Sequence, residues 1–337
     1  MGIMTRAIRL FGIILCALVV CAMGATGAET LSPQDQKAVI EANKFVERGN
    51  EFRKKDSLAR AKAEYEHALR IFPRHLDALY NLAVVCIDLK QPDEAIAHCK
   101  HYLDLKNNDP DVWNQLGVLL DEKGDKAGAL AAYEQAVAIA PKFGQAHNNL
   151  GVLLEEQGKL DDARRHLELF VKLEEEAGRH TGEAYYSLGV LELEQLHLKD
   201  AKKQLQKALD IDPDAPLYNN AIGDVYLAEK NPGMARSYYQ KAIGKDPRSA
   251  VAYSGLGDAQ RAMGDRDKAL ASYQKSLELR PDYGLVHYKL GLLFEATDPA
   301  ETIKHFESYL NSGKNLQYRK EVSAKLEKLK QGSKNAN

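Results

Sequence analysis

Apolar residues along the chain recur three and four positions apart, in short stretches separated by glycine, proline and polar residues. One helical face of this kind is formed by Leu116, Leu119 and Leu120. Gly124 then interrupts the pattern, and a second stripe follows at Ala129, Ala132, Tyr133 and Ala136. Because glycine ends helices and Pro141 cannot continue one, residues 110–143 are predicted to form two helices joined by a short turn.

The same pattern returns along the chain at a fixed interval. Pro213, Pro247 and Pro281 are evenly spaced, one period apart, and Pro73 and Pro141 are separated by two such periods. Only the interval from Pro141 to Pro213 is irregular, because it is four residues longer than two periods. One helix hairpin cannot bury both of its apolar stripes, so the units are expected to stack into a continuous array.

A period of about 34 residues with this composition resembles the tetratricopeptide repeat. The best match carries Trp113, Leu116, Gly117, Leu120, Ala129, Tyr133, Ala136 and Pro141. The resemblance implies an all-α, right-handed superhelical solenoid over residues 42–310. Its eight predicted units are 42–75, 76–109, 110–143, 144–177, 182–215, 216–249, 250–283 and 284–310. The small residues Gly117, Ala129 and Ala136 are expected to let the two helices of a unit approach closely.

Both ends of the array and one junction depart from the period. The four extra residues lie in 172–182, which predicts either a longer second helix in the fourth unit or a longer loop after it. Residues 311–331 have one apolar face and many lysines, as suits a capping helix, and 332–337 are predicted to be a disordered tail. In the lead-in, 29–41, Ser32 and Pro33 are typical of a helix start.

The N-terminal residues 1–28 have the pattern of an export signal. Arg6 and Arg9 precede the apolar run 10–22, and small residues follow up to Ala28. The run is shorter than the roughly 20 residues that span a bilayer. We therefore predict an exported protein, periplasmic or secreted, and keep an uncleaved signal that anchors it to the inner membrane as the alternative. A membrane is expected as a partner only in that second case.

Charge and motifs exclude several classes of function. Lys and Arg number 46 and Asp and Glu 48, so no overall basic field favours nucleic acid. The chain contains no Gly-rich phosphate loop, G-x-S-x-G or H-E-x-x-H motif. The nearest approach to a metal cluster is the run His98, Cys99 and His101, but no second ligand group stands nearby in sequence. We predict no cofactor, no metal site and no catalytic activity.

Two cysteines remain beyond the signal segment, Cys86 and Cys99. They fall in the two predicted helices of one hairpin. Exported proteins permit disulfides, so these residues are a candidate pair. The favoured interpretation is that both are small, buried hydrophobic side chains.

The first helix of each tetratricopeptide unit lines a concave groove, and the resemblance implies which residues face it here. The predicted partner-binding residues are Tyr80, Asn81, Asp88, Asn114, Asp121, Glu122, Asn148, Glu155, Glu156, Tyr186, Asn220, Asp224, Asp258 and Tyr288. Acidic residues outnumber basic ones at these and neighbouring lining positions, where the only bases are Arg53, Lys54 and Arg261. Charge complementarity then favours a basic or amphipathic peptide, and the alternative is an ordinary solvated helix face.

The predicted function is a non-catalytic scaffold for protein–protein interaction. The combination of export signal and repeats resembles proteins that assemble envelope, pilus or secretion machinery. The alternative is a substrate-recognition or accessory array for a separate envelope enzyme, such as a glycosyltransferase or protease. Asn81 and Asn149 fit the asparagine row of sugar-transferase arrays, but Gln115, Ser187 and Ala221 interrupt it.

Overall fold

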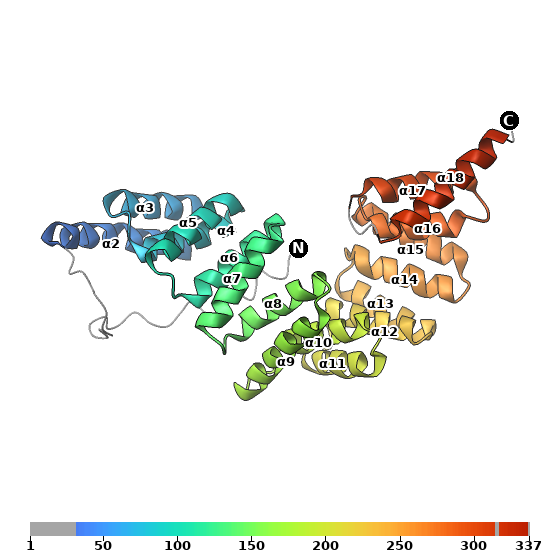
Figure 1. Cartoon of the computed structure of the whole chain (residues 1–337), viewed down its shortest axis with the longest axis horizontal. Helices are drawn as coiled ribbons and strands as arrows, with labels where there is room; N and C mark the ends of the chain where they lie inside the picture. Colours follow the sequence, from blue (N-terminus) through green and yellow to red (C-terminus); the bar gives the residue numbers. More distant parts are fainter. Residues whose placement is uncertain (1–31, 314–316, 336–337) are drawn as a thin grey trace. The chain divides into compact units, whose positions relative to one another are not determined.

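The computed structural model describes residues 32–313 and 317–335, and within these ranges the regular elements are all α-helices (Figure 1). The helices are α2 (Pro33–Lys54), α3 (Leu58–Ile71), α4 (Leu76–Asp88), α5 (Pro92–Leu105), α6 (Pro110–Lys123), α7 (Lys126–Ile139), α8 (Gly144–Glu156), α9 (Leu160–Glu176), α10 (Gly182–Glu194), α11 (Leu198–Ile211), α12 (Pro216–Ala228), α13 (Pro232–Lys245), α14 (Ala250–Ala262), α15 (Arg266–Leu279), α16 (Gly284–Phe294), α17 (Pro299–Asn311) and α18 (Arg319–Asn335). The predicted all-α repeat fold is confirmed.

The chain divides into two compact units, one up to Val85 and one from Cys86 onward. In the first unit α2 packs against α3. Its polar contacts include Tyr65 Oη, which donates to Asn50 Oδ1 at 2.7 Å, and a 2.8 Å hydrogen bond between His75 Nε2 and Asn43 Oδ1. In the second unit the hairpins α6–α7, α8–α9, α10–α11, α12–α13, α14–α15 and α16–α17 follow in order.

The two helices of a hairpin touch at a glycine of the first helix. A Cβ atom on Gly117 would lie 2.5 Å from Cε1 of Tyr133, so any larger residue would displace that ring. The tyrosine itself is 2% exposed. The same relationship recurs in the pairs Gly49–Tyr65, Gly151–Leu167, Gly189–Leu205, Gly223–Tyr239, Gly257–Tyr273 and Gly291–Phe306. Small residues therefore set the helix separation, as predicted, and large ones fill the space beside them.

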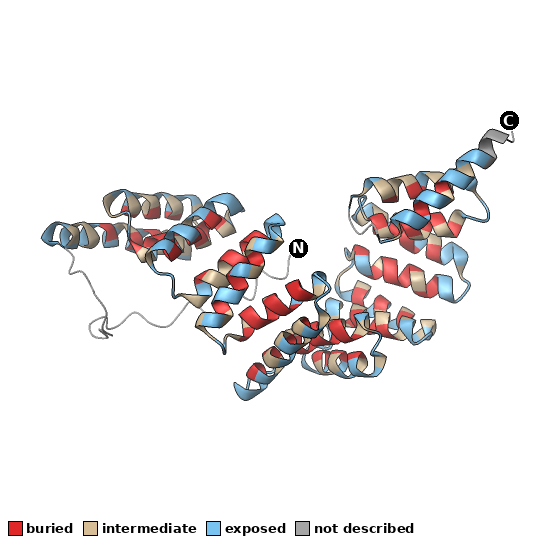
Figure 2. Cartoon of the chain, in the orientation of Figure 1, coloured by how far each residue is buried: buried red, intermediate tan, exposed pale blue. Residues whose placement is uncertain are grey.

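Neighbouring hairpins of the second unit stack through apolar contacts. Leu205 and Leu209 of α11 share one cluster with Ile222 and Val225 of α12. Helices α8 and α14 lie between neighbours and are buried over most of their length (Figure 2). The core is therefore continuous along the stack, as a repeat array requires.

The irregular interval is divided between a helix and a loop. Helix α9 has 17 residues where α7 and α15 have 14, and five residues rather than four separate it from the next helix. Both alternatives considered for the four extra residues are therefore correct in part. Of the three added residues of α9, Glu174 is buried, with 7% of its surface exposed.

The ends of the array differ from the predicted boundaries. Helix α2 starts at Pro33, with the Ser32 hydroxyl accepting from the Asp35 amide at 3.1 Å, which confirms the predicted cap. Helix α18 starts later than the predicted 311–331 and continues to Asn335, so residues 332–335 are helical rather than disordered. No proline follows Lys330, and Gly332 alone does not end the helix.

Helix α18 covers the last hairpin. Val322 and Leu326 pack with Phe306 and Tyr309 of α17, which gives the end of the stack a polar outer face. The predicted export segment 1–28 lies outside the described residues. Within 32–313 and 317–335, no helix is both long enough and apolar enough to span a bilayer.

Candidate partner-binding site

The first helices of successive hairpins in the second unit lie side by side. Contacts join α8 to α10, α10 to α12 and α12 to α14. Polar side chains bridge them: Asn149 Nδ2 donates to Asn114 Oδ1 at 2.9 Å, and Asn148 Nδ2 donates to Glu183 Oε1 at 3.0 Å. We call the solvent-facing side of α6, α8, α10, α12, α14 and α16 the first-helix face.

Most of the predicted binding residues are at least partly accessible. In the first unit, Tyr80 is exposed and Asn81 is half-buried. In the second unit, the accessible residues are Asp88, Asn114, Asp121, Glu122, Glu155, Glu156, Tyr186, Asn220, Asp224 and Asp258. Asn148 and Tyr288 are buried, with 4% and 9% of their surface exposed. Asn148 therefore contributes to the packing of the array, whereas Tyr288 also lines a cavity at the C-terminal part of the first-helix face.

Two of the predicted acids hold core tyrosines in place. Tyr239 Oη donates to Asp224 Oδ1 at 2.5 Å, and Tyr273 Oη donates to Asp258 Oδ1 at 2.7 Å. In each case the acid directly follows the glycine against which the tyrosine ring packs. Sequence reasoning missed this role, although the signal was present as a Gly-Asp pair in the first helix and a tyrosine in the second helix of the same unit.

The acids of α6 and α8 carry less free charge than their number indicates. Lys126 of α7 lies 2.6 Å from Asp121 Oδ1 and 2.5 Å from Glu156 Oε2. Burial raises the pKa of Glu155 to about 8, and the neighbouring carboxylate of Glu194 acts in the same direction. The raised pKa favours the protonated form of this carboxyl pair, which can give the proton up when a cation approaches.

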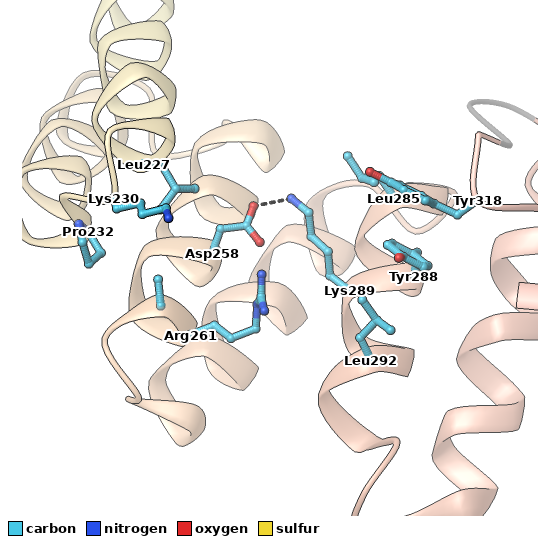
Figure 3. Close-up of a pocket in the computed structure, with 11 residues that line it drawn as sticks. Leu227, Lys230, Pro232, Asp258, Arg261, Leu285, Tyr288, Lys289, Leu292 and Tyr318 are labelled. Carbon is cyan, nitrogen blue, oxygen red and sulfur yellow. Dashed lines mark hydrogen bonds and ion pairs between the residues drawn. The ribbon is translucent and has the colours of Figure 1, made fainter. Parts of the chain in front are cut away.

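A cavity of about 660 Å³ opens at the C-terminal part of the first-helix face. It is lined by Leu227, Lys230, Pro232, Asp258, Arg261, Ala262, Leu285, Tyr288, Lys289, Leu292 and Tyr318. Figure 3 shows Leu285 and Tyr318 on one side, Leu227 and Lys230 on the other, and the Asp258–Lys289 pair between them. The cavity thus combines apolar walls with several charged groups.

The charge of this cavity is positive rather than negative. Lys289 Nζ lies 2.5 Å from Asp258 Oδ2 and donates to Ser254 Oγ at 2.7 Å. Lys230 and Arg261 add two further cations to the lining, and Asp258 is its one acid. The prediction of an acidic face therefore does not extend to this cavity. Lys289 was missed because its position is taken by asparagine, glutamine or a small residue in the second to seventh units.

An aromatic cluster closes the cavity on the side of the cap. The rings of Tyr288 and Tyr318 stack with their centroids 4.2 Å apart and an angle of 7° between their planes. Tyr288 Oη also donates to Glu321 Oε2 at 3.4 Å. Tyr318 could not be assigned from the sequence, because it lies in the connection before the capping helix, outside the repeat pattern.

The cysteine pair is not a disulfide in the structure. Cys86 and Cys99 both carry reduced thiols and both are buried, with 0% and 2% of the residue surface exposed. Burial raises the pKa of Cys99 to about 12, and the neighbouring Cys86 adds to this effect. In the structure both residues thus pack as small buried side chains.

Comparisons with known proteins agree with this architecture. Models of the tetratricopeptide repeat match residues 53–117, 110–143, 143–214 and 186–250, and a further model described as TPR repeat matches 257–298. Protein FlbA of Caulobacter vibrioides is 29% identical over 91 residues, which are 27% of this chain and 15% of FlbA. The chain thus spans only a small part of that relative.

Solved structures show the same fold at low sequence identity. A tetratricopeptide repeat protein from Parabacteroides merdae superposes with a TM-score of 0.64 at 16% identity, over 75% of this chain and 98% of that one. The APC/C hetero-tetramer Cut9–Hcn1 contains a chain that matches with a TM-score of 0.61 at 18% identity, over 81% of this chain and 52% of that chain. Repeats of this kind present extended binding surfaces and form scaffolds for protein–protein interaction. The chain belongs to the tetratricopeptide repeat proteins.

Proposed function

We propose that the first-helix face of the second unit binds a peptide segment of a partner protein, and that the chain has no catalytic activity of its own. The observation that carries this proposal is the cavity between α12, α14 and α16, which presents apolar walls and an excess of cations. Ligand sites combine apolar surface with a few polar groups in this way.

The carboxyl pair of Glu155 and Glu194 favours a partner that places a basic residue beside it. A lysine or arginine near the pair favours the ionised form of Glu155, whose pKa is raised to about 8 in its absence. Binding then releases a proton, so affinity for a basic peptide rises as the pH increases through about 8.

The lining of the cavity favours an acidic residue and an apolar residue in the same partner. Lys230 and Arg261 attract a carboxylate, and Leu227, Leu285 and Leu292 accept an aliphatic or aromatic side chain. The partner is therefore an amphipathic segment, with basic residues along α8 and α10 and an acidic, apolar end at α12–α16.

For the cellular setting, we propose export to the periplasm or cell exterior, with a role in envelope, pilus or secretion assembly. The support is the pattern of residues 1–28 together with the repeats. An accessory array for a separate envelope enzyme is the alternative. It rests on Asn81 and Asn149, and the Asn149 amide already donates to Asn114.

Charge reversal on the first-helix face tests the binding surface. Asp121, Glu122, Glu155 and Glu156 are changed together to lysine, and a photo-crosslinking residue at the exposed Val152 captures the partner from envelope extract. We expect the crosslinked band to disappear while helical content, measured by circular dichroism, stays unchanged.

A matched control makes the same charge change elsewhere. Its four positions are exposed acids of second helices, Glu134, Asp161, Glu168 and Glu176. This variant should retain the crosslinked band. Loss of the band in both variants, or in neither, would contradict the proposed surface.

A further inference from the structure

Three side chains with metal-binding atoms converge where α4 ends and α5 begins. The thiol of Cys86, a carboxylate oxygen of Glu94 and an imidazole nitrogen of His98 all lie within 4.8 Å of one another. Cys86 is fully buried, His98 is half-buried and Glu94 is exposed. The three side chains therefore extend from a buried position to the protein surface.

The backbone fixes this convergence. Glu94 and His98 are four residues apart on α5, so their side chains lie on one face, a turn apart. The amide of Gln91 donates to the carbonyl oxygen of Cys86 at 2.8 Å, and the amide of Lys90 donates to that of Ile87 at 2.9 Å. These bonds hold Cys86 at a set position relative to the start of α5.

The run of His98, Cys99 and His101 explains why sequence reasoning did not find this cluster. Adjacent residues on a helix point about 100° apart, so Cys99 does not share a helix face with His98. Cys99 is directed into the core and His101 is exposed. Of the three, only His98 has a ligand atom in the cluster with Cys86 and Glu94.

The three ligand types together select for one class of ion. Thiolate, imidazole and carboxylate bind Zn²⁺ at about 2.3, 2.0–2.1 and 2.0–2.2 Å. Tetrahedral geometry at these lengths places ligand atoms roughly 3.3–3.7 Å apart, so the side chains need to close by at most roughly 1.5 Å. Ca²⁺ and Mg²⁺ prefer sets made entirely of oxygen, which this is not.

We propose that Cys86, Glu94 and His98 form a three-ligand site for Zn²⁺, with the fourth position open to water beside the exposed Glu94. Coordination forms a sulfur–zinc bond and releases the thiol proton to solvent, with no transfer of electrons. The two anionic ligands balance the charge of the ion. The site links Cys86 to α5, and so stabilises the start of the second unit when metal is bound.

The test uses the full chain, stripped of metal and kept reduced, and titrated with zinc sulfate in competition with a chromophoric chelator. We expect one Zn²⁺ per chain and a rise in Tm on binding. With Co²⁺ as the probe, thiolate coordination gives a charge-transfer band in the near ultraviolet. Cys86→Ser and His98→Gln should each weaken Zn²⁺ binding by at least about tenfold and remove the rise in Tm.

The same α5 helix supplies matched controls. Cys99→Ala removes the other buried thiol and His101→Gln the other histidine of the run, and both should bind Zn²⁺ as the parent chain does. Because His98 is half-buried, its variant is informative even where Cys86→Ser folds poorly. No binding above that of a buffer blank, or binding that survives His98→Gln and is lost with Cys99→Ala, would overturn the proposal. None of these outcomes depends on whether the first-helix face binds a partner.

Discussion

Tyr239 donates its hydroxyl to Asp224 Oδ1 at 2.5 Å, across the hairpin of α12 and α13. The tyrosine is fully buried and its ring packs against Gly223, the residue before the acid. Burial raises the pKa of Asp224 to about 6, although the hydrogen bond from Tyr239 and the charge of Lys289 act in the opposite direction. Asp224 therefore contributes to the packing of the hairpin as well as to the surface that a ligand could contact.

Removing that hydroxyl should destabilise the array. Tyr239→Phe leaves the Asp224 carboxyl without its donor, and a buried polar group that loses its partner costs about 1–3 kcal/mol. We expect a loss of this size in the free energy of unfolding, measured by urea denaturation followed by circular dichroism.

The α6–α7 hairpin provides the matched control for this change. Tyr133 occupies the equivalent place, but Val118 follows the packing glycine there and offers no acceptor. Tyr133→Phe should therefore cost well under about 1 kcal/mol. Equal losses in the two variants would show that the hydrogen bond to Asp224 contributes nothing.

The contact between Gly117 and Tyr133 predicts a second loss of stability. Gly117→Leu places a side chain where even a Cβ atom would lie 2.5 Å from the ring, and overpacking of this kind costs roughly 1–3 kcal/mol. A fall in Tm is the expected result. Gly244→Ala is the control, because Gly244 lies in helix α13 with open space around it, so this change should leave Tm unchanged or raise it.

The fold could be predicted from the sequence because one pattern is repeated many times. The spacing of Pro213, Pro247 and Pro281 and the small residues at Gly117 and Ala129 reflect constraints that each unit meets alone. Where the constraint lies between units, the prediction was less complete. The extension of α9 and the continuation of α18 depend on packing against neighbours, which the period does not encode.

The candidate site was less predictable, because its properties come from pairs of residues on different helices. In the sequence Asp258 has no evident partner, but in the structure the hydroxyl of Tyr273 and the ammonium of Lys289 lie beside it. In the same way, Lys126 neutralises Asp121 but lies on α7, the second helix of its unit. The predicted binding residues were taken from first helices alone. Tyr318 lies outside the repeats altogether. Counting charges along one helix of each unit could not reveal these relationships.

The turn after each first helix predicts a stabilising substitution. In the turns after α2, α4, α6, α8, α10, α12 and α14 one residue is left-handed. It is Gly124 with φ 87° after α6 but Leu196 with φ 58° after α10. A leucine in this conformation is strained by roughly 1–2 kcal/mol, and the residue is 72% exposed, so little packing is lost with it.

Leu196→Gly should therefore raise the free energy of unfolding by about 1 kcal/mol. The reverse change, Gly124→Ala, should lower it by a similar amount, because nothing surrounds Gly124 and only the backbone conformation is affected. Chemical denaturation of both variants and of the parent chain checks whether the two changes shift the free energy of unfolding in opposite directions. A destabilised Leu196→Gly protein would mean that the side chain, not the backbone strain, decides the balance.

Two histidine pairs, each with one buried and one half-buried ring, predict how stability depends on pH. His147 Nδ1 lies 2.8 Å from His166 Nδ1, and His287 Nδ1 lies 3.0 Å from His305 Nδ1. The Nε2 atoms of His147 and His287 each face a proline carbonyl oxygen at 3.1 Å, and must donate to it. Each Nδ1 pair then shares one proton, and a second proton at this contact would break the hydrogen bond and leave two N–H groups facing each other.

The pKa shifts set the direction of this dependence. Burial lowers the pKa of His166, and burial with the neighbouring His287 lowers that of His305 to about 4. The unfolded chain takes up these protons near pH 6.5, so between about 4 and 6.5 it binds more protons than the folded chain. Stability therefore falls as the pH is lowered through this window, by at most about 1.4 kcal/mol per pH unit for each histidine.

Urea denaturation between pH 4.5 and 7.5 checks this expectation on a variant with both His166→Gln and His305→Gln. The double variant should lose less stability than the parent chain as the pH falls. His180→Gln, at an exposed position between α9 and α10, should follow the parent chain. Asp224, whose folded pKa of about 6 is raised, adds stability as the pH falls through the same window. That contribution is common to all three proteins, so the difference between their pH profiles isolates the histidines, and parallel profiles would rule this mechanism out.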